Sequence, residues 1–259
     1  LTEHQQKSVD AVHDAYHRIR TGRGTTDDAK ALSPGRFADA PADQHDEIAK
    51  TMLKSSAVHF NRDHAYRRAL NQAPPEHNAK VQAMTKVLNH DKKAGKRSII
   101  FSGSVKELHI LRDHLEGQGH KVGILSGAED AADFKRRANP EKGDPEFDVA
   151  LLSPAAQEGV NLQSFQVQHN FDVPEPYAAA DQRAGRIHRT GQSKDVEVHS
   201  WHHDHPYEHA ALRRLRRKED LSEVFQSPTG QTDDSGIAQH YERAMHAKHE
   251  ADVAPGAVA

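Results

Sequence analysis

Two arginines set three residues apart, Arg186 and Arg189, are the side chains of this chain with the clearest capacity for chemistry. On a helix their guanidinium groups would share one face, and Gly185 lies directly beside them. A transferring phosphoryl group spreads its charge over several oxygens, so fixed cationic forks aimed the same way stabilise it. The spacing therefore indicates phosphoryl transfer, against the alternative of a solvated basic helix.

Two further motifs precede the arginine pair. Residues 151–163 read LLSPAAQEGVNLQ, residues 170–174 read NFDVP, and the arginines lie within DQRAGRIHRTGQ at residues 181–192. In order, spacing and identity these elements resemble the last motifs of superfamily-two helicases, and they are most similar to the Swi/Snf-like branch of DNA-dependent ATPases and translocases. One departure is Glu175, which follows the proline at a place where the family usually has a tryptophan.

The resemblance implies roles for individual residues of these motifs. Arg186 and Arg189 would act as arginine fingers toward the γ-phosphate of ATP, and Gln182 would orient or sense that phosphate. In the family, the segment at 159–163 couples backbone contacts to the nucleotide cleft, and glycines permit close approach there. The cleft residues implied in this way are Gly159, Asn161 and Gly185.

Half of the machinery for ATP hydrolysis is missing from the sequence. It contains no Gly-x-x-x-x-Gly-Lys-Ser/Thr phosphate loop and no paired acidic box after a buried strand, although this chemistry needs both a phosphate cradle and a magnesium carboxylate. The resemblance implies ATP with Mg²⁺ as the cofactor, bound mainly by a first RecA-like lobe. Residues 1–5 resemble the segment that leaves that lobe, and the sequence opens on Leu1, so we expect the first lobe upstream in a longer protein. This segment alone is predicted to be inactive.

Composition limits the remaining classes of protein. Of the 259 residues 28% are charged, and the net charge is −3, so any contact with duplex DNA must be local. The absence of cysteine excludes disulfides and thiolate metal sites, and no apolar run is long enough for a membrane span or a signal peptide. We therefore expect a cytoplasmic or nucleoid-associated protein whose partners are duplex DNA and the upstream lobe, with no membrane contact.

Residues 1–94 are expected to form a helical lead-in. Apolar residues recur at spacings of three and four over residues 9–19, 48–53 and 81–88, which is typical of amphipathic helices. The stretch 21–43 instead collects Gly, Thr, Asp, Pro and Ala. That composition predicts a polar loop or disordered insert.

Residues 95–226 change to a pattern of short apolar strands that alternate with helices. The alternation predicts parallel strands with crossover helices on both faces, as in the RecA-like α/β lobe that the resemblance implies. A final helix is expected over 205–218, and the polar tail, 227–259, has helical spacing only over 237–249. The expected strands cover residues 98–101, 121–125, 147–152, 167–171 and 196–201.

Ligands of open parallel sheets meet the loops at the carboxyl ends of the strands, which is where two Ser-Gly segments fall. Residues 102–104 begin a helix, so their hydroxyl and amide groups could receive a phosphate of a nucleic-acid backbone, with helix capping as the alternative. Residues 126–127 resemble a family segment near the bound strand. The DNA contacts expected at strand ends and in the 151–163 motif are Ser102, Gly103, Ser104, Ser126, Gly127, Ser153 and Gln163.

Three alternatives stay open at the level of the sequence. A non-catalytic relative would bind DNA or protein through a degenerate helicase lobe while keeping the same arginines. The 21 histidines, including His205 and His209 four residues apart, would either hold a metal or reflect compositional bias. The basic run 213–218 would either dock on nucleic-acid phosphates or form a solvated helix face.

Overall fold

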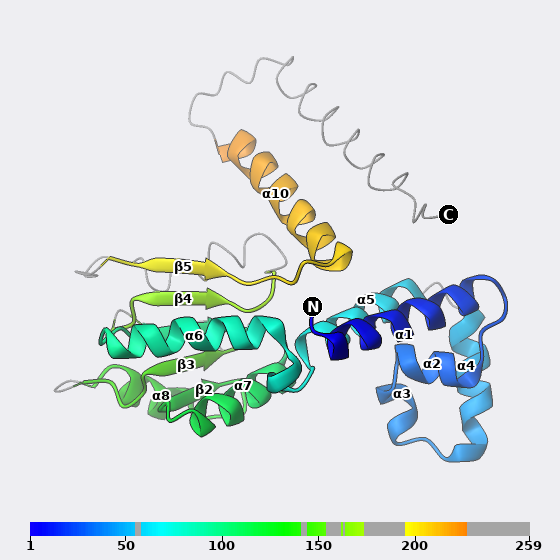
Figure 1. The fold of residues 1–259 in the computed structure, drawn as a ribbon, viewed down its shortest axis with the longest axis horizontal. Helices are drawn as coiled ribbons and strands as arrows, with labels where there is room; N and C mark the ends of the chain where they lie inside the picture. The colour runs from blue at the N-terminus through cyan, green and yellow to red at the C-terminus, as the bar shows by residue number, and fades with distance from the viewer. Residues whose placement is uncertain (55–57, 141–143, 154–161, 163, 174–194, 227–259) are drawn as a thin grey trace.

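The computed structural model describes residues 1–54, 58–140, 144–153, 162, 164–173 and 195–226, of which 59–60 and 218–226 are described by their backbone alone. Within these residues a helical segment precedes a parallel β-sheet that is flanked by helices (Figure 1). This is the α/β, RecA-like class that the sequence predicts, and the prediction is confirmed.

The sheet has five strands in the order β2-β3-β1-β4-β5, and every neighbouring pair is parallel. All residues of β1, β3 and β4 are buried, as expected for strands that a parallel sheet places between two layers of helices, and in β4 these include the polar residues Gln168, His169 and Asn170. Each strand lies inside its predicted range. The strands are β1 (Ser98–Phe101), β2 (Val122–Leu125), β3 (Val149–Leu152), β4 (Val167–Asn170) and β5 (Glu197–Ser200).

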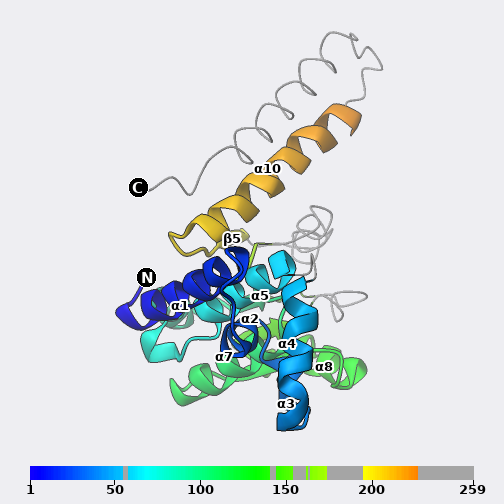
Figure 2. The ribbon, with the colours of Figure 1, turned by 90° about the vertical axis from the view of Figure 1, so that its right-hand side faces the viewer.

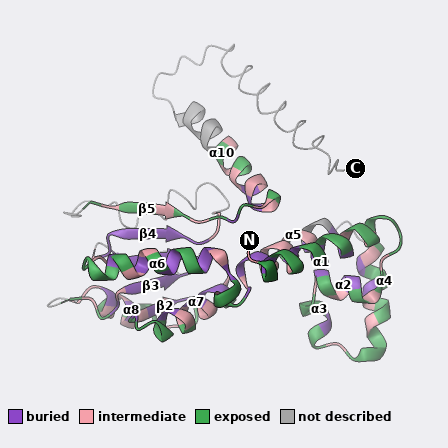
Figure 3. Cartoon of the chain, viewed as in Figure 1, coloured by how far each residue is buried: buried purple, intermediate pink, exposed green. Residues whose placement is uncertain are grey.

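Helices cover both faces of the sheet because successive side chains of a strand point to opposite sides. Ile100 packs with the apolar stripes of α6 (Ala79–Lys93) and α7 (Val105–Gly117). Its neighbours Ile99 and Phe101 pack on the other face with Phe134 of α8 (Ala131–Ala138). Two separate apolar clusters therefore form the core of a doubly wound lobe, with buried residues gathered along the strands (Figure 3).

The helices within residues 3–71 pack as a bundle to one side of the sheet (Figure 1). Helix α1 (Glu3–Arg20) begins at a capping box on Thr2 and packs its buried Val12 and Ala15 against Ala65 of the later helix α5. The apolar spacing over residues 9–19 predicted this helix. The remaining elements are η1 (Ala42–Gln44), α4 (His45–Lys54), α5 (Val58–Asn71) and η2 (Pro75–His77).

The prediction of a loop or disordered insert at 21–43 was wrong, because α2 (Thr26–Leu32) and α3 (Gly35–Ala38) lie there. Thr25 forms a capping box with Asp28, whose carboxylate also accepts a hydrogen bond at 2.7 Å from Arg18 of α1. Leu32 is fully buried and Phe37 is 6% exposed. A few well-placed apolar residues and one cap thus outweigh a composition that is typical of loops.

The last described helix, α10 (Pro206–Gln226), runs eight residues beyond the predicted end at 218. Glu208 and Ala211 are buried near its start, and the rest of the helix projects away from the sheet (Figures 1 and 2). None of the described helices is long and apolar enough to cross a membrane.

Candidate functional site

The carboxyl ends of β1 and β4 lie side by side and bring the loop at 102–104 against Asp172. Gly103 N–H donates to Asp172 Oδ2 at 2.5 Å. A Cβ atom at Gly103 would lie 3.0 Å from that same oxygen, so a side chain there would require Asp172 to move by a few tenths of an ångström. The edge of the sheet where the sequence predicts a ligand is therefore closed by an internal carboxylate.

Arg67 reaches this edge from α5 in the helical segment. Its Nε and Nη2 atoms donate to the two carboxylate oxygens of Glu107 at 3.1 and 3.2 Å, and Nη2 also donates to Asp172 Oδ2 at 2.7 Å. Burial disfavours the charged guanidinium, but the charges of Glu107 and Asp172 outweigh it and raise the pKa of Arg67 above its usual value. One permanent cation is thus shared by two carboxylates.

Sequence reasoning missed Arg67. It lies 35 residues before Ser102 on a helix rich in basic residues, and nothing in its spacing distinguishes it from Arg62 or Arg68. Its role depends on how α5 docks against β1 and β4, which is a tertiary property.

The two serines of the first loop have different surroundings. Ser102 is fully buried, and its hydroxyl donates to Glu107 Oε2 at 2.7 Å, so it supports the carboxylate that holds Arg67. Ser104 is the N-cap of α7, where its hydroxyl accepts from the backbone N–H of Glu107 at 3.4 Å. The capping that the sequence allows is present at Ser104, and a contact with nucleic acid at either serine stays a prediction.

The ends of β2 and β3 form a second group on the same edge. Ser126 donates from its backbone N–H and its hydroxyl to Glu129 Oε2 at 2.5 and 2.9 Å, and Ser153 donates to the carbonyl oxygen of Ser126 at 2.9 Å. Burial would raise the pKa of Glu129, but the hydrogen bonds from Ser126 lower it. Gly127 has a φ of +105°, which suits glycine and ends the strand sharply.

The structure therefore places six of the predicted contact residues, those at 102–104, 126–127 and 153, at the carboxyl ends of three neighbouring parallel strands. Ser102, Gly103 and Ser126 donate to internal carboxylates and Ser153 donates to a backbone carbonyl, while the Ser104 hydroxyl caps α7. The other predicted site residues lie outside the described residues. These are Gly159, Asn161, Gln163, Gln182, Gly185, Arg186 and Arg189.

The histidine-rich end of the lobe forms a buried polar network. Glu208 pairs with Lys80 at 3.0 Å and accepts from the backbone N–H of His203, whose ring contacts the Gln5 side chain at 2.9 Å. Burial alone would raise the pKa of Glu208, but hydrogen bonds from His203 and the charge of Lys80 lower it to about 2. The network ties together α1, α6 and α10.

A second group of histidines lies apart from this network, on β4 and β5. His169 is fully buried on β4, stacks against His199 and accepts at Nδ1 from the Trp201 indole at 3.0 Å; burial lowers the pKa of His169 to about 3. Among the described residues, no group of three or more His, Cys, Asp or Glu side chains is arranged to hold a metal ion. The pair at 205 and 209 therefore has no metal-binding partners in that part of the chain.

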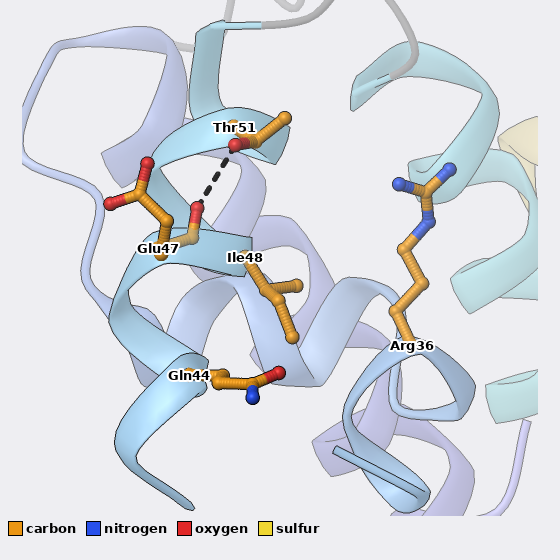
Figure 4. A pocket seen from close by; sticks show the side chains of 5 residues that line it. All are labelled: Arg36, Gln44, Glu47, Ile48 and Thr51. Carbon is orange, nitrogen blue, oxygen red and sulfur yellow. Dashed lines mark hydrogen bonds between the residues drawn. The ribbon is translucent and has the colours of Figure 1, made fainter. Parts of the chain in front are cut away.

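One pocket of about 380 Å³ lies away from the sheet, between α3 and α4 (Figure 4). Arg36 faces it from α3, while Glu47 and Thr51 are one turn apart on α4, where the Thr51 hydroxyl donates to the Glu47 carbonyl at 3.0 Å. Its lining has no nucleophile that is hydrogen-bonded to a side-chain base. It is not part of the strand-end site.

Comparison with known proteins gives this geometry a context. Residues 79–191 match the helicase conserved C-terminal domain. The chain is 25% identical over 233 residues to Helicase SWR1 of Candida glabrata, which covers 83% of this chain and 16% of that protein. It is 36% identical over 86 residues to the ATP-dependent helicase YqhH of Bacillus subtilis, which covers 33% of this chain and 15% of that protein.

A solved structure, the C-terminal part of the Fun30 ATPase domain, shares the fold with a TM-score of 0.51 and 19% identity, over 72% of this chain and 62% of that one. The chain spans 16% or less of the length of the SWR1 helicases first matched. The matched domain, the order of the three sequence motifs and the parallel sheet are all those of a helicase C-terminal lobe. Residues 79–191 of this chain carry a helicase C-terminal domain, and the chain is similar to SWR1 helicases, of the Swi/Snf-like branch.

Proposed function

We propose that this chain is the second lobe of an ATP-dependent DNA translocase, in which residues 95–226 form the lobe, 1–94 a helical lead-in and 227–259 a polar tail. ATP with Mg²⁺ would bind mainly to a first lobe elsewhere in the complete protein. Arg186 and Arg189 would reach the γ-phosphate as arginine fingers, with Gln182 beside them. The observation that carries the proposal is the match of residues 79–191, which include these three side chains, to the helicase C-terminal domain.

Duplex DNA is the proposed partner, and the strand-end loops are its proposed contacts. Support comes from the position of residues 102–104, 126–127 and 153 at one edge of the sheet, where open parallel sheets bind ligands. Backbone amides and small side chains at such an edge suit phosphate oxygens, which position a nucleic acid without reading its sequence. A cytoplasmic or nucleoid-associated location is part of the same proposal.

The isolated chain is expected to show no DNA-stimulated ATP turnover. Its sequence lacks both a phosphate loop and a magnesium carboxylate box, and without them the γ-phosphate is neither held nor neutralised. Phosphate release from repurified chain, with and without duplex DNA, measures this directly. Turnover that survives repurification would contradict the assignment of the chain as half of an ATPase.

Binding of duplex DNA by the chain alone is expected to be weak and steeply salt-dependent. Only one lobe contributes backbone contacts, and the net charge of −3 adds no general attraction. Fluorescence anisotropy of a labelled duplex, titrated at about 50 and 200 mM salt, checks the expectation. Tight binding that ignores salt would argue against contacts to the phosphate backbone.

A further inference from the structure

Two hydrogen-bond donors from separate parts of the chain converge on one oxygen at the edge of the sheet. Arg67 Nη2 and Gly103 N–H lie 2.7 and 2.5 Å from Asp172 Oδ2. A guanidinium and a backbone amide aimed at one anionic oxygen are the donors that proteins use to hold a phosphate oxygen. Gly103 is exposed, and the side chains of Arg67 and Asp172 are 26% and 11% exposed, so the site lies near the surface.

The cationic donor is held in place independently of Asp172. Glu107 is fully buried at its side chain and binds Arg67 through both Nε and Nη2, while the Ser102 hydroxyl fixes Glu107 in turn. Loss of the Asp172 contact would leave the guanidinium fork anchored and still aimed at the same point. The site is therefore preorganised for an oxyanion other than its own carboxylate.

We propose that Arg67 and the Gly103 N–H form an oxyanion site for a phosphate of a nucleic-acid backbone, and that Asp172 occupies this site in the free chain. The inference rests on the proposed nucleic-acid function and adds a contact from the helical segment. Binding exchanges one anion for another: the Asp172 carboxylate leaves Arg67 Nη2 and the Gly103 N–H, and a phosphate oxygen takes both hydrogen bonds.

Charge selects a nucleic-acid strand over a free phosphate ion. Arg67 carries one positive charge against the two negative charges of Glu107 and Asp172, so the three groups together are negative and disfavour an added anion that brings no other contact. Asp172 belongs to the same chain and competes at an effective concentration on the order of millimolar. A strand that also touches the neighbouring loops at 104 and 126–127 gains further contacts, whereas inorganic phosphate gains none.

The test compares two ion pairs of the same chain, Arg67–Asp172 and Arg112–Asp113. Asp172→Asn removes the competing charge and keeps the side-chain shape, and Arg67→Gln removes the cation. Asp113→Asn and Arg112→Gln are the matched controls, because Arg112 and Asp113 form an exposed ion pair of 2.8 Å on α7. A labelled duplex is titrated against each variant at two or more salt concentrations, with inorganic phosphate as a competitor.

We expect Asp172→Asn to bind DNA roughly fivefold to tenfold more tightly than the parent, since a like charge next to the phosphate is gone. Arg67→Gln is expected to weaken binding and to lower the slope of log K against log salt by about one. The two control variants should match the parent within about twofold, as exposed charges do. Millimolar inorganic phosphate should compete poorly against the duplex.

Arg67→Gln leaves the buried Glu107 carboxylate without its cation, which could unfold the chain. The double variant Arg67→Gln/Glu107→Gln removes both charges, and its slope of log K against log salt should fall by the same amount as that of Arg67→Gln. Equal affinity of Asp172→Asn and Asp113→Asn, with salt-dependent binding by the parent, would overturn the site and leave the nucleic-acid function standing. Absence of binding by the parent and by Asp172→Asn alike would overturn both.

Discussion

Arg186→Ala in the complete protein, with its first lobe present, is expected to lower ATP turnover by on the order of 10³–10⁵-fold, or roughly 4–7 kcal/mol. An arginine finger stabilises charge that develops mainly in the transition state, so ATP binding should stay largely intact. Arg189→Ala is expected to behave in the same way. Steady-state turnover at saturating ATP and DNA, together with nucleotide binding, separates the two effects.

Two further variants sharpen this prediction. Arg186→Lys should be nearly as damaging as alanine, because an ammonium keeps the charge and loses the bidentate fork. Arg183→Ala is the internal control, since Arg183 lies outside the Gly-Arg-x-x-Arg pattern and should change turnover little. Equal turnover in Arg186→Ala and the parent would return this segment to a solvated basic helix.

Glu208→Ala is expected to lower the free energy of unfolding by about 3–5 kcal/mol, because it leaves Lys80 buried without a partner. The side chains of Lys80 and Glu208 are 1% and 5% exposed. Urea titration of the chain measures the loss. Glu3→Ala is the control: the Glu3–Lys7 pair is 84% and 76% exposed, and its removal should cost less than about 1 kcal/mol.

The same carboxylate gives the stability a pH dependence of known sign. The pKa of Glu208 falls from 4.5 to about 2 on folding, so the unfolded chain takes up this proton first. The resulting stabilisation, roughly 3 kcal/mol, is complete above pH 4.5 and is lost as the pH falls from 4.5 through 2. Glu208→Gln combined with Lys80→Met should flatten this part of the profile; an unchanged profile would show that Glu208 does not carry it.

Strands β1 and β3 could be predicted from the sequence because parallel strands buried on both faces read as short apolar runs, whereas β4 has Val167 as its one apolar residue. Residues 98–101 form β1 with the predicted bounds, and the alternation with helices fixed the parallel class. The strand ends then identified the edge where residues 102–104, 126–127 and 153 gather.

The partners of these residues could not be predicted in the same way. Arg67 meets Asp172 across 105 positions of the chain, and Lys80 meets Glu208 across 128, so both pairs depend on tertiary docking. The ordered insert at 21–43 depends on Leu32 and Phe37 finding a core within the helical bundle. Local composition carries no signal for contacts of this kind.

ATP hydrolysis by the complete protein, measured with and without duplex DNA, tests most directly whether this chain is the second lobe of a DNA translocase. We predict turnover that rises on addition of duplex DNA and that is lost when the lobe at 95–226 is removed. Turnover that is equal with and without duplex DNA, or unchanged by removal of the lobe, would contradict the assignment.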